Sequence, residues 1–164
     1  MMIVVVLDQV SKLSILDHLE LGESLTIIPD FLDLTLVMNP GAAFGMFSKL
    51  EPTVRRLVLG AVTFLAIGLV LVLLKKEAKD DKISQFALFL VLGGALGNII
   101  DRFRFDAVVD FLDVYYGNYH WPAFNVADSA ICVGVFLVIL RLSFFVEHSA
   151  SLVKEKTETT ESAE

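Results

Sequence analysis

The chain has few of the residues that build cross-linked folds or metal centres. Cys132 is its single cysteine, so an internal disulfide and a cysteine-rich metal site are both excluded. Within an apolar segment this cysteine is most simply a small packing residue. Three histidines, His18, His120 and His148, are scattered without the spacing of metal ligands. We therefore expect no metal and no other cofactor.

Charged residues are also scarce. Asp, Glu, Lys and Arg make up 20% of the 164 residues, whereas 55% are hydrophobic, and the mean hydropathy is +0.70. A soluble domain of this size is rarely so apolar, so the composition favours a membrane protein. The N-terminus lacks a basic stretch and a small-residue cleavage site after its apolar run, which argues against a cleavable signal peptide.

Apolar runs predict the membrane helices. Leu57–Leu74 carries no charge and approaches the roughly 20 residues that a spanning helix needs. Ser84–Ile100 and Val126–Val146 are two further candidates, each with polar residues gathered toward one end. Near the N-terminus a short apolar run ends at Asp8, so the first helix is apparently short. We expect an all-α polytopic membrane protein with a bundle of four transmembrane helices.

Lysine and arginine counts in short loops predict the orientation of these helices. The link Lys75–Lys82 holds four lysines, which places it in the cytoplasm. The flanking helices then bring Asp110 and Asp128 to the outer face and leave the C-terminus in the cytoplasm. Four arginines would also lie outside, namely Arg55, Arg56, Arg102 and Arg104.

Segments outside the helices have patterns of their own. Glu23–Leu50 contains short β-leaning runs broken by proline and glycine, which predict a small β-element on the outer face. Between the third and fourth spans lies an aromatic cluster typical of a membrane interface, Tyr115, Tyr116, Tyr119, His120 and Trp121. From Glu147 onward the chain has five Glu and two Lys. We expect a membrane domain of residues 1–148 and a disordered acidic tail of residues 149–164.

Two aspartates at the edges of apolar segments are the most informative residues. Asp110 in VVDF and Asp128 in FNVAD would both lose hydration near lipid, which is costly unless they are paired, hydrogen-bonded or protonated. Two such groups would share one proton, an arrangement suited to acid–base chemistry. Asn125 is expected to cap the last helix, whose dipole would favour ionised Asp128. Asp110 would then hold the proton.

Other polar residues allow a functional or a purely structural interpretation. One face of the third helix carries Asn98, Asp101 and Arg102, which either line a site or include a local Asp101–Arg102 ion pair. Asp8 either belongs to a functional cluster with Gln9 and Lys12 or simply pairs with Lys12 one turn later.

Two glycines and two more aspartates are assigned structural roles. Gly93 and Gly97 form a G-x-x-x-G motif, which predicts close packing of a neighbouring helix. Asp106 and Asp113 lie outside the apolar runs and are expected to be solvated loop residues.

Taken together, five motifs resemble the prolipoprotein signal peptidase family, signal peptidase II. They are DQVSK at Asp8–Lys12, NPGAAFG at Asn39–Gly45, GGALGNIIDR at Gly93–Arg102, VVDF at Val108–Phe111 and FNVAD at Phe124–Asp128. They follow the family's order and span nearly all of the chain except the acidic tail. Ser11 stands where the family usually has Thr, and Asp106-Ala107 replaces a more usual Gly.

The resemblance implies an intramembrane aspartic endopeptidase of the bacterial cytoplasmic (inner) membrane, with its active site toward the outer face. Its substrates would be diacylglyceryl-modified prolipoproteins, cleaved just before the lipidated cysteine. Membrane lipid would surround it, and no nucleic acid or cofactor would take part. By motif, Asp110 and Asp128 are the catalytic positions. The supporting positions are Asp8, Asn39, Asn98, Asp101, Arg102 and Asn125.

Two other classes of protein compete with a peptidase. A proton-coupled transporter or channel subunit would use buried Asp groups, but it needs polar groups through the depth of the membrane. Here the second span has none, and the others concentrate theirs near one face. A non-catalytic membrane adaptor would tolerate Asp to Asn changes at positions 110 and 128, whereas a peptidase would lose turnover.

Overall fold

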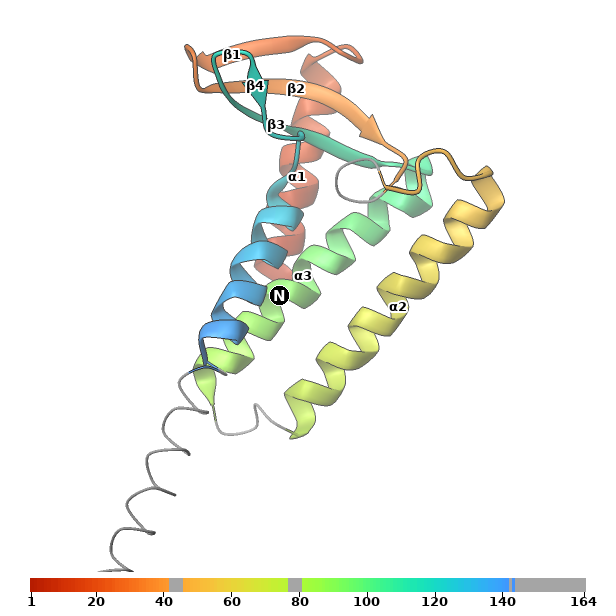
Figure 1. Cartoon of the computed structure of the whole chain (residues 1–164), viewed down its shortest axis with the longest axis vertical. Helices are drawn as coiled ribbons and strands as arrows, with labels where there is room; N and C mark the ends of the chain where they lie inside the picture. The colour runs from red at the N-terminus through yellow and green to blue at the C-terminus, as the bar shows by residue number, and fades with distance from the viewer. Residues whose placement is uncertain (42–45, 77–80, 142, 144–164) are drawn as a thin grey trace, which may run out of the picture.

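The computed structural model describes residues 1–41, 46–76, 81–141 and 143. Its elements follow the order α1 (Met2–His18), β1 (Ser24–Ile28), β2 (Leu32–Asn39), α2 (Pro52–Lys76), α3 (Lys82–Phe105), β3 (Val108–Tyr116) and β4 (Tyr119–His120), and a last helix covers residues 126–141. The strands lie together at one end of the helices (Figure 1). The expected acidic tail of residues 149–164 and part of the NPGAAFG motif lie outside the described residues.

Helices α2 and α3 occupy the predicted spans and extend beyond them at both ends. Both are long and apolar enough to cross a membrane, over Pro52–Lys75 and Lys82–Phe105. Proline suits the first turn of α2 because its missing N–H would have no helical partner there, and Glu51 accepts hydrogen bonds from the next free amides. Asp81 caps α3 by accepting from Ile83 N at 3.1 Å.

Helix α1 has its polar residues inside and its apolar residues outside. Asp8 and Lys12 are buried, whereas Ile3 is 75% exposed and Val10 is 60% exposed. A helix in water shows the opposite pattern, since apolar burial drives its packing. The expected short first helix is present as 17 residues, and its apolar outer face suits contact with lipid.

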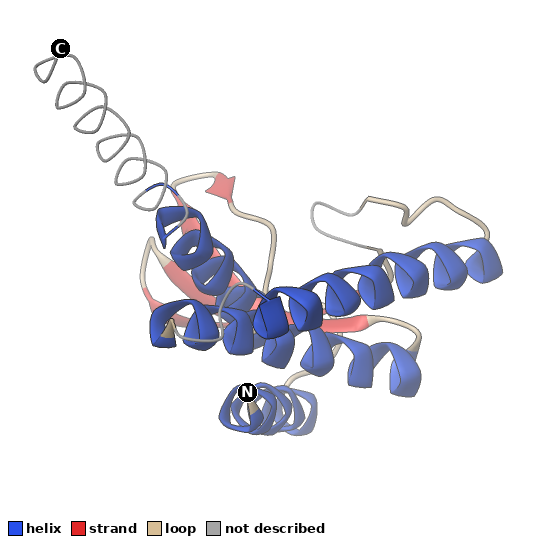
Figure 2. Cartoon of the chain, turned by 90° about the horizontal axis from the view of Figure 1, so that it is seen from below, coloured by secondary structure: helices blue, strands red, loops and turns tan. Residues whose placement is uncertain are grey.

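A four-stranded antiparallel sheet in the order β1-β2-β3-β4 covers one end of the bundle (Figure 2). Strands β1 and β2 confirm the β-element predicted after the first helix. Strand β3 was not predicted. Asp110 lies on this strand opposite Val37, not at the edge of a membrane segment, and Asp113 also lies on it rather than in the expected loop. The register shifts between Leu34 and Val37, where β2 bulges against β3.

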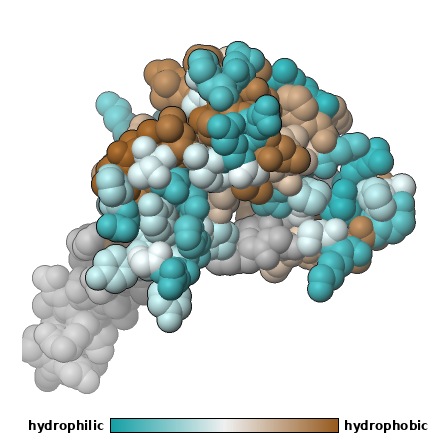
Figure 3. Space-filling model, turned by 90° about the horizontal axis from the view of Figure 1, so that it is seen from above, coloured by the Kyte–Doolittle hydropathy of each residue, from teal (hydrophilic) through white to brown (hydrophobic). Residues whose placement is uncertain are grey.

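Two apolar clusters hold these elements together. One joins α1 to the sheet through Ile15, Leu36, Val109 and Phe111. The other joins α2 to α3, and its α2 members lie in the second half of that helix: Ile67, Val70, Leu73 and Leu74. Seen from the side of the sheet, exposed apolar side chains lie among polar ones (Figure 3). Leu25 on β1 and Phe31 in the turn before β2 are among the exposed apolar residues.

Glycines let α3 approach its neighbours closely. A Cβ added at Gly93 would lie 2.9 Å from Met1 O, and one at Gly97 would lie 2.5 Å from Asp8 Oδ2, which confirms the predicted packing role of this pair. Two glycines that the sequence did not single out do the same for the last helix: Gly94 faces the carbonyl oxygen of Ala127, and Gly134 faces that of Ala87.

Candidate active site

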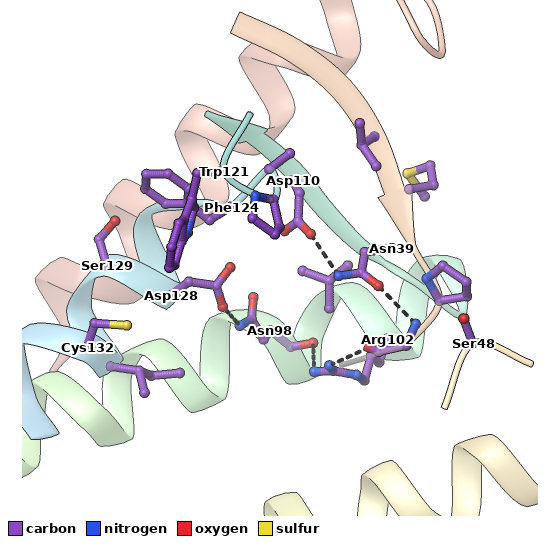
Figure 4. A pocket seen from close by; sticks show the side chains of 18 residues that line it. Asn39, Ser48, Asn98, Arg102, Asp110, Trp121, Phe124, Asp128, Ser129 and Cys132 are labelled. Atoms are coloured by element: carbon purple, nitrogen blue, oxygen red, sulfur yellow. Dashed lines mark hydrogen bonds between the residues drawn. The ribbon is translucent and has the colours of Figure 1, made fainter. Parts of the chain in front are cut away.

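A cavity of about 610 Å³ opens between the sheet, α3 and the last helix, a volume typical of ligand sites. Asp110 and Asp128 both line it and point into it from opposite walls (Figure 4). Three of the predicted supporting residues line it as well, namely Asn39, Asn98 and Arg102. The fold therefore brings together two carboxyl groups that are far apart in the sequence.

Asp110 is held on β3 by two side-chain amides. Its Oδ1 accepts a hydrogen bond from Asn125 Nδ2 at 2.7 Å, and its Oδ2 accepts one from Asn39 Nδ2 at 3.0 Å. Burial, helped by the nearby Asp128 carboxylate and opposed by the two amides, raises the pKa of Asp110 to about 6. A carboxyl with this pKa stays mostly protonated as the pH rises from 4 toward 6, where an ordinary aspartate is already ionised.

Asp128 lies in the first turn of the last helix and is held by the residues around it. Its Oδ1 accepts from Asn98 Nδ2 at 2.8 Å, and its Oδ2 accepts from the backbone N of Asn125 at 3.3 Å. In return Asp128 N donates to Asn125 Oδ1 at 2.9 Å. This reciprocal pair is a capping box, so the predicted N-cap at Asn125 is present.

A buried ionic cluster lies behind the two carboxyl groups. Lys12 Nζ contacts Asp8 Oδ2 at 2.9 Å, Asp101 Oδ2 at 2.8 Å and Asn98 Oδ1 at 3.0 Å. Because Lys12 donates to the amide oxygen of Asn98, that amide must present its nitrogen to Asp128. Gln9 Nε2 joins the cluster by donating to Asp101 Oδ1 at 2.9 Å.

Each acidic member of this cluster also fixes the backbone beside one cavity aspartate. Asp8 Oδ1 accepts from Ala127 N at 2.9 Å, directly before Asp128. Asp101 Oδ2 accepts from Val109 N at 3.1 Å, directly before Asp110. The cluster therefore connects α1 and α3 to the strand and the helix that carry the two carboxyl groups.

The remaining predicted supporting residues occupy a different place from the cavity liners. Asp8, Asp101 and Asn125 do not line the cavity; they lie behind it, fully or almost fully buried. The Asp8–Lys12 pair exists and at the same time belongs to the larger cluster. Asp101 pairs with Lys12 rather than with Arg102, whose Nη1 donates to Asn98 O and whose Nη2 donates to Gly41 O.

Some features of the site were not predicted. Lys12 was placed in a possible cluster with Asp8 and Gln9, but its contacts with Asp101 and Asn98 on α3 were not predicted. Cys132 lines the cavity and is exposed there, so its expected role as a packing residue is wrong. Asp106 is exposed as expected, but it ends α3 at φ 56°, a conformation that glycine adopts more easily.

Metal-ligating groups are not gathered anywhere in the described part of the chain. No three His, Cys, Asp or Glu side chains there lie in a group that could hold a metal ion. His120 instead contacts Asp113 at 2.9 Å and stacks on Tyr115, and His18 bonds to Ser14 O.

Comparison with known proteins gives consistent matches along most of the chain. Residues 1–144 match the family described as Signal peptidase (SPase) II. A lipoprotein signal peptidase of Syntrophus aciditrophicus is 46% identical over 140 residues, which cover 85% of this chain and 87% of that protein. One from Desulforapulum autotrophicum is 45% identical over 142 residues, covering 87% of this chain and 88% of that protein.

Two solved structures share the fold. A bacterial membrane enzyme solved by the in meso method at 2.3 Å resolution superposes with a TM-score of 0.81 at 35% identity, covering 90% of this chain and 87% of that one. A second, at 1.9 Å resolution, gives a TM-score of 0.76 at 36% identity, covering 86% of this chain and 88% of that one.

Proposed function

Because the chain belongs to the signal peptidase II family and is a peptidase that cleaves the signal peptides of prolipoproteins, we propose that Asp110 and Asp128 are its catalytic pair. The observation that carries this proposal is that both carboxyl groups line one cavity and are held there by separate amide donors. The family match does not favour the alternative of a proton-coupled transporter or channel subunit.

The pair suits amide hydrolysis through two complementary protonation states. An ionised carboxylate takes a proton from an attacking water while its protonated partner donates a hydrogen bond to the scissile carbonyl. We assign the base to Asp128, because it lies at the positive end of a helix dipole, and the proton to Asp110. When the amine leaves, the two groups exchange these roles. The Asp128 carboxylate disfavours ionisation of Asp110, so we expect the pair to keep one proton.

The supporting residues divide into two groups in this proposal. Asn39, Asn98 and Arg102 border the cavity and are placed to orient substrate or stabilise negative charge on the carbonyl oxygen. Asp8, Asp101 and Asn125 act as positioning residues, since they hold the backbone and amide groups on which the catalytic pair depends.

The substrate is proposed to be a prolipoprotein that already carries diacylglycerol on a cysteine, with cleavage just before that residue. The cavity wall is mainly apolar apart from the polar groups at the pair, with Val37, Met38, Ile131 and Phe124 among its members. Acyl chains can therefore stay in the lipid leaflet while the scissile bond reaches the carboxyl groups.

The protein is a bacterial inner-membrane protein, and we propose that all four helices enter the membrane with the sheet on the outer face. The apolar outer surface of α1 supports its contact with lipid, and the lysine-rich link between α2 and α3 supports a cytoplasmic position for the opposite end. The C-terminus is then cytoplasmic. No nucleic acid has a role in this proposal.

Cleavage of a purified diacylglyceryl-modified prolipoprotein tests the catalytic assignment. D110N and D128N are each expected to lower turnover by about 10²–10⁴-fold, the usual contribution of a general acid or base, while the protein still inserts and folds. D33N removes a carboxylate of the same sheet outside the cavity and should keep full activity. Full activity in either D110N or D128N would contradict the proposal.

A further inference from the structure

A second cavity, of about 320 Å³, lies between α2 and α3 at the end nearest the sheet. Arg102 and Pro40 line both cavities, so they form the wall between this groove and the catalytic site. Arg102 lies at the border of the catalytic cavity in Figure 4. The groove itself takes no part in the proposed cleavage chemistry.

Positive charge predominates in this groove. Arg55, Arg56 and Arg102 line it, and Asp106 is the only acidic residue among its lining residues. The polar contacts of the two α2 arginines are long: Arg55 Nη1 donates to Ser48 O at 3.3 Å, and Arg56 Nε lies 3.5 Å from Asp106 Oδ1. Each guanidinium has five N–H donors, so these contacts leave donors for a ligand.

Below the arginines the groove has an apolar wall. Leu59 and Phe64 contribute from α2, and Ile99 and Phe103 from α3; Phe64 is 64% exposed and Phe103 is 81% exposed. The apolar cluster that joins the two helices begins only at Ile67, further along α2. The groove therefore opens sideways, toward the lipid that surrounds the bundle.

We propose that this groove binds the phosphate of an anionic phospholipid, with the first part of its acyl chains against the apolar wall. A guanidinium matches a phosphate through two parallel hydrogen bonds, and basic pockets between membrane helices suit lipid headgroups. The ligand also accounts for arginines at a membrane face where the positive-inside rule disfavours them. A volume near 320 Å³ fits a headgroup and the adjoining glycerol rather than a whole lipid.

Native mass spectrometry of the purified full chain tests this proposal with phosphatidylglycerol as the probe. We expect one tightly held phosphatidylglycerol, which R55Q/R56Q weakens about tenfold or more because two charge-assisted contacts are lost. K75Q/K82Q removes two charges from the opposite ends of the same helices and should leave binding unchanged. Equal binding by wild type and R55Q/R56Q would overturn the proposal.

Two further arms identify the ligand class. Phosphatidylcholine is expected to bind at least about tenfold more weakly, since it carries no net negative charge to match the groove. Inorganic phosphate alone should not displace the lipid, because it lacks the apolar contacts. Displacement by inorganic phosphate, or equal affinity for both lipids, would overturn the anionic phospholipid as the occupant.

A steric variant checks the position without touching the arginines. Gly60 lines the groove, and a Cβ there meets no atom within 4 Å, so G60L fills the groove without a backbone clash. G68L is the matched control, because Gly68 has the same free space on α2 but lies outside the groove. G60L should lose the bound lipid and G68L should keep it; the reverse would contradict the location. The readout is binding, so its failure would leave the proposed catalysis standing.

Discussion

Lys12 donates to three oxygen atoms, on Asp8, Asp101 and Asn98, and is 2% exposed. A buried ion pair contributes little net stability, because desolvation of the charges offsets much of their attraction. Here the cluster has a more specific effect. Its two carboxylates hold the amides of Ala127 and Val109, so the position of the proposed catalytic pair depends on a cation that has no hydrogen bond to either aspartate of that pair.

Removal of this cation should therefore be severe. K12M leaves two carboxylates buried without a counter-ion, and we expect a loss of about 3–5 kcal/mol in the free energy of unfolding. Thermal unfolding in detergent measures the loss. R56Q breaks an exposed ion pair and should change little. The triple variant D8N/K12M/D101N should recover part of the loss; a stable K12M protein would contradict the account.

The raised pKa of Asp110 predicts a dependence of stability on pH. Its pKa is about 6 in the folded protein against an ordinary value near 3.8, so the folded state binds the proton more tightly. The tighter proton binding adds to the free energy of unfolding below about pH 4, and this stabilisation is lost as the pH rises through 6. The difference between the two pKa values corresponds to about 3 kcal/mol at most. D110N does not titrate there. The difference in Tm between D110N and wild type should therefore grow in favour of D110N from about pH 4.5 to about pH 7.5.

Asp17 provides a control for this measurement, because its carboxylate is exposed on α1. D17N should follow the wild-type pH profile. A Tm difference between D110N and wild type that stays constant with pH would show that Asp110 titrates alike in the folded and unfolded states.

At the level of elements, the last helix is positioned by glycine contacts. Gly94 of α3 faces the carbonyl of Ala127, which immediately precedes Asp128, so any side chain at Gly94 must displace the start of that helix. Only glycine permits this close approach. The distance between the helix and α3 in turn sets the Asn98–Asp128 hydrogen bond.

A single methyl group should be enough to disturb this contact. G94A is expected to lower both thermal stability and cleavage, because the helix that carries Asp128 has to move away from α3. G68A is the matched control, since Gly68 meets no neighbouring atom, and alanine there should preserve activity and stabilise the helix by up to about 1 kcal/mol. Equal activity of the two variants would contradict this role for Gly94.

The sequence predicted those helices and strands whose residues carry a clear local pattern of hydropathy or β-propensity. The uncharged run around Leu57–Leu74 predicted α2, and the β-leaning runs predicted β1 and β2. Strand β3 was missed, because aspartates at positions 110 and 113 interrupt its apolar pattern and its pairing with β2 is set by contacts distant in sequence. The same limit applies to Lys12, whose partnership with Asp101 depends on how α1 packs against α3.

At the scale of the whole molecule, the proposed orientation can be measured by labelling. On a C132A background, a cysteine at Thr26 on the sheet should react with a membrane-impermeant maleimide in intact spheroplasts. A cysteine at Lys75, at the opposite end of α2, should react only after the membrane is permeabilised. Both positions are exposed, so accessibility within the protein does not limit the reaction. The reversed pattern would contradict an outer-face active site.

The buried lysine also bears on how the chain is made. Lys12 emerges from the ribosome early, yet its partner Asn98 follows 86 residues later, and the amide that binds Asp8 follows it by 119 residues. Until those segments are synthesised, the first helix carries charges that have no stable place in hydrocarbon. The first helix therefore reaches its settled position in the bilayer only after the start of the last helix is synthesised, the segment that also delivers Asp128 to the cavity.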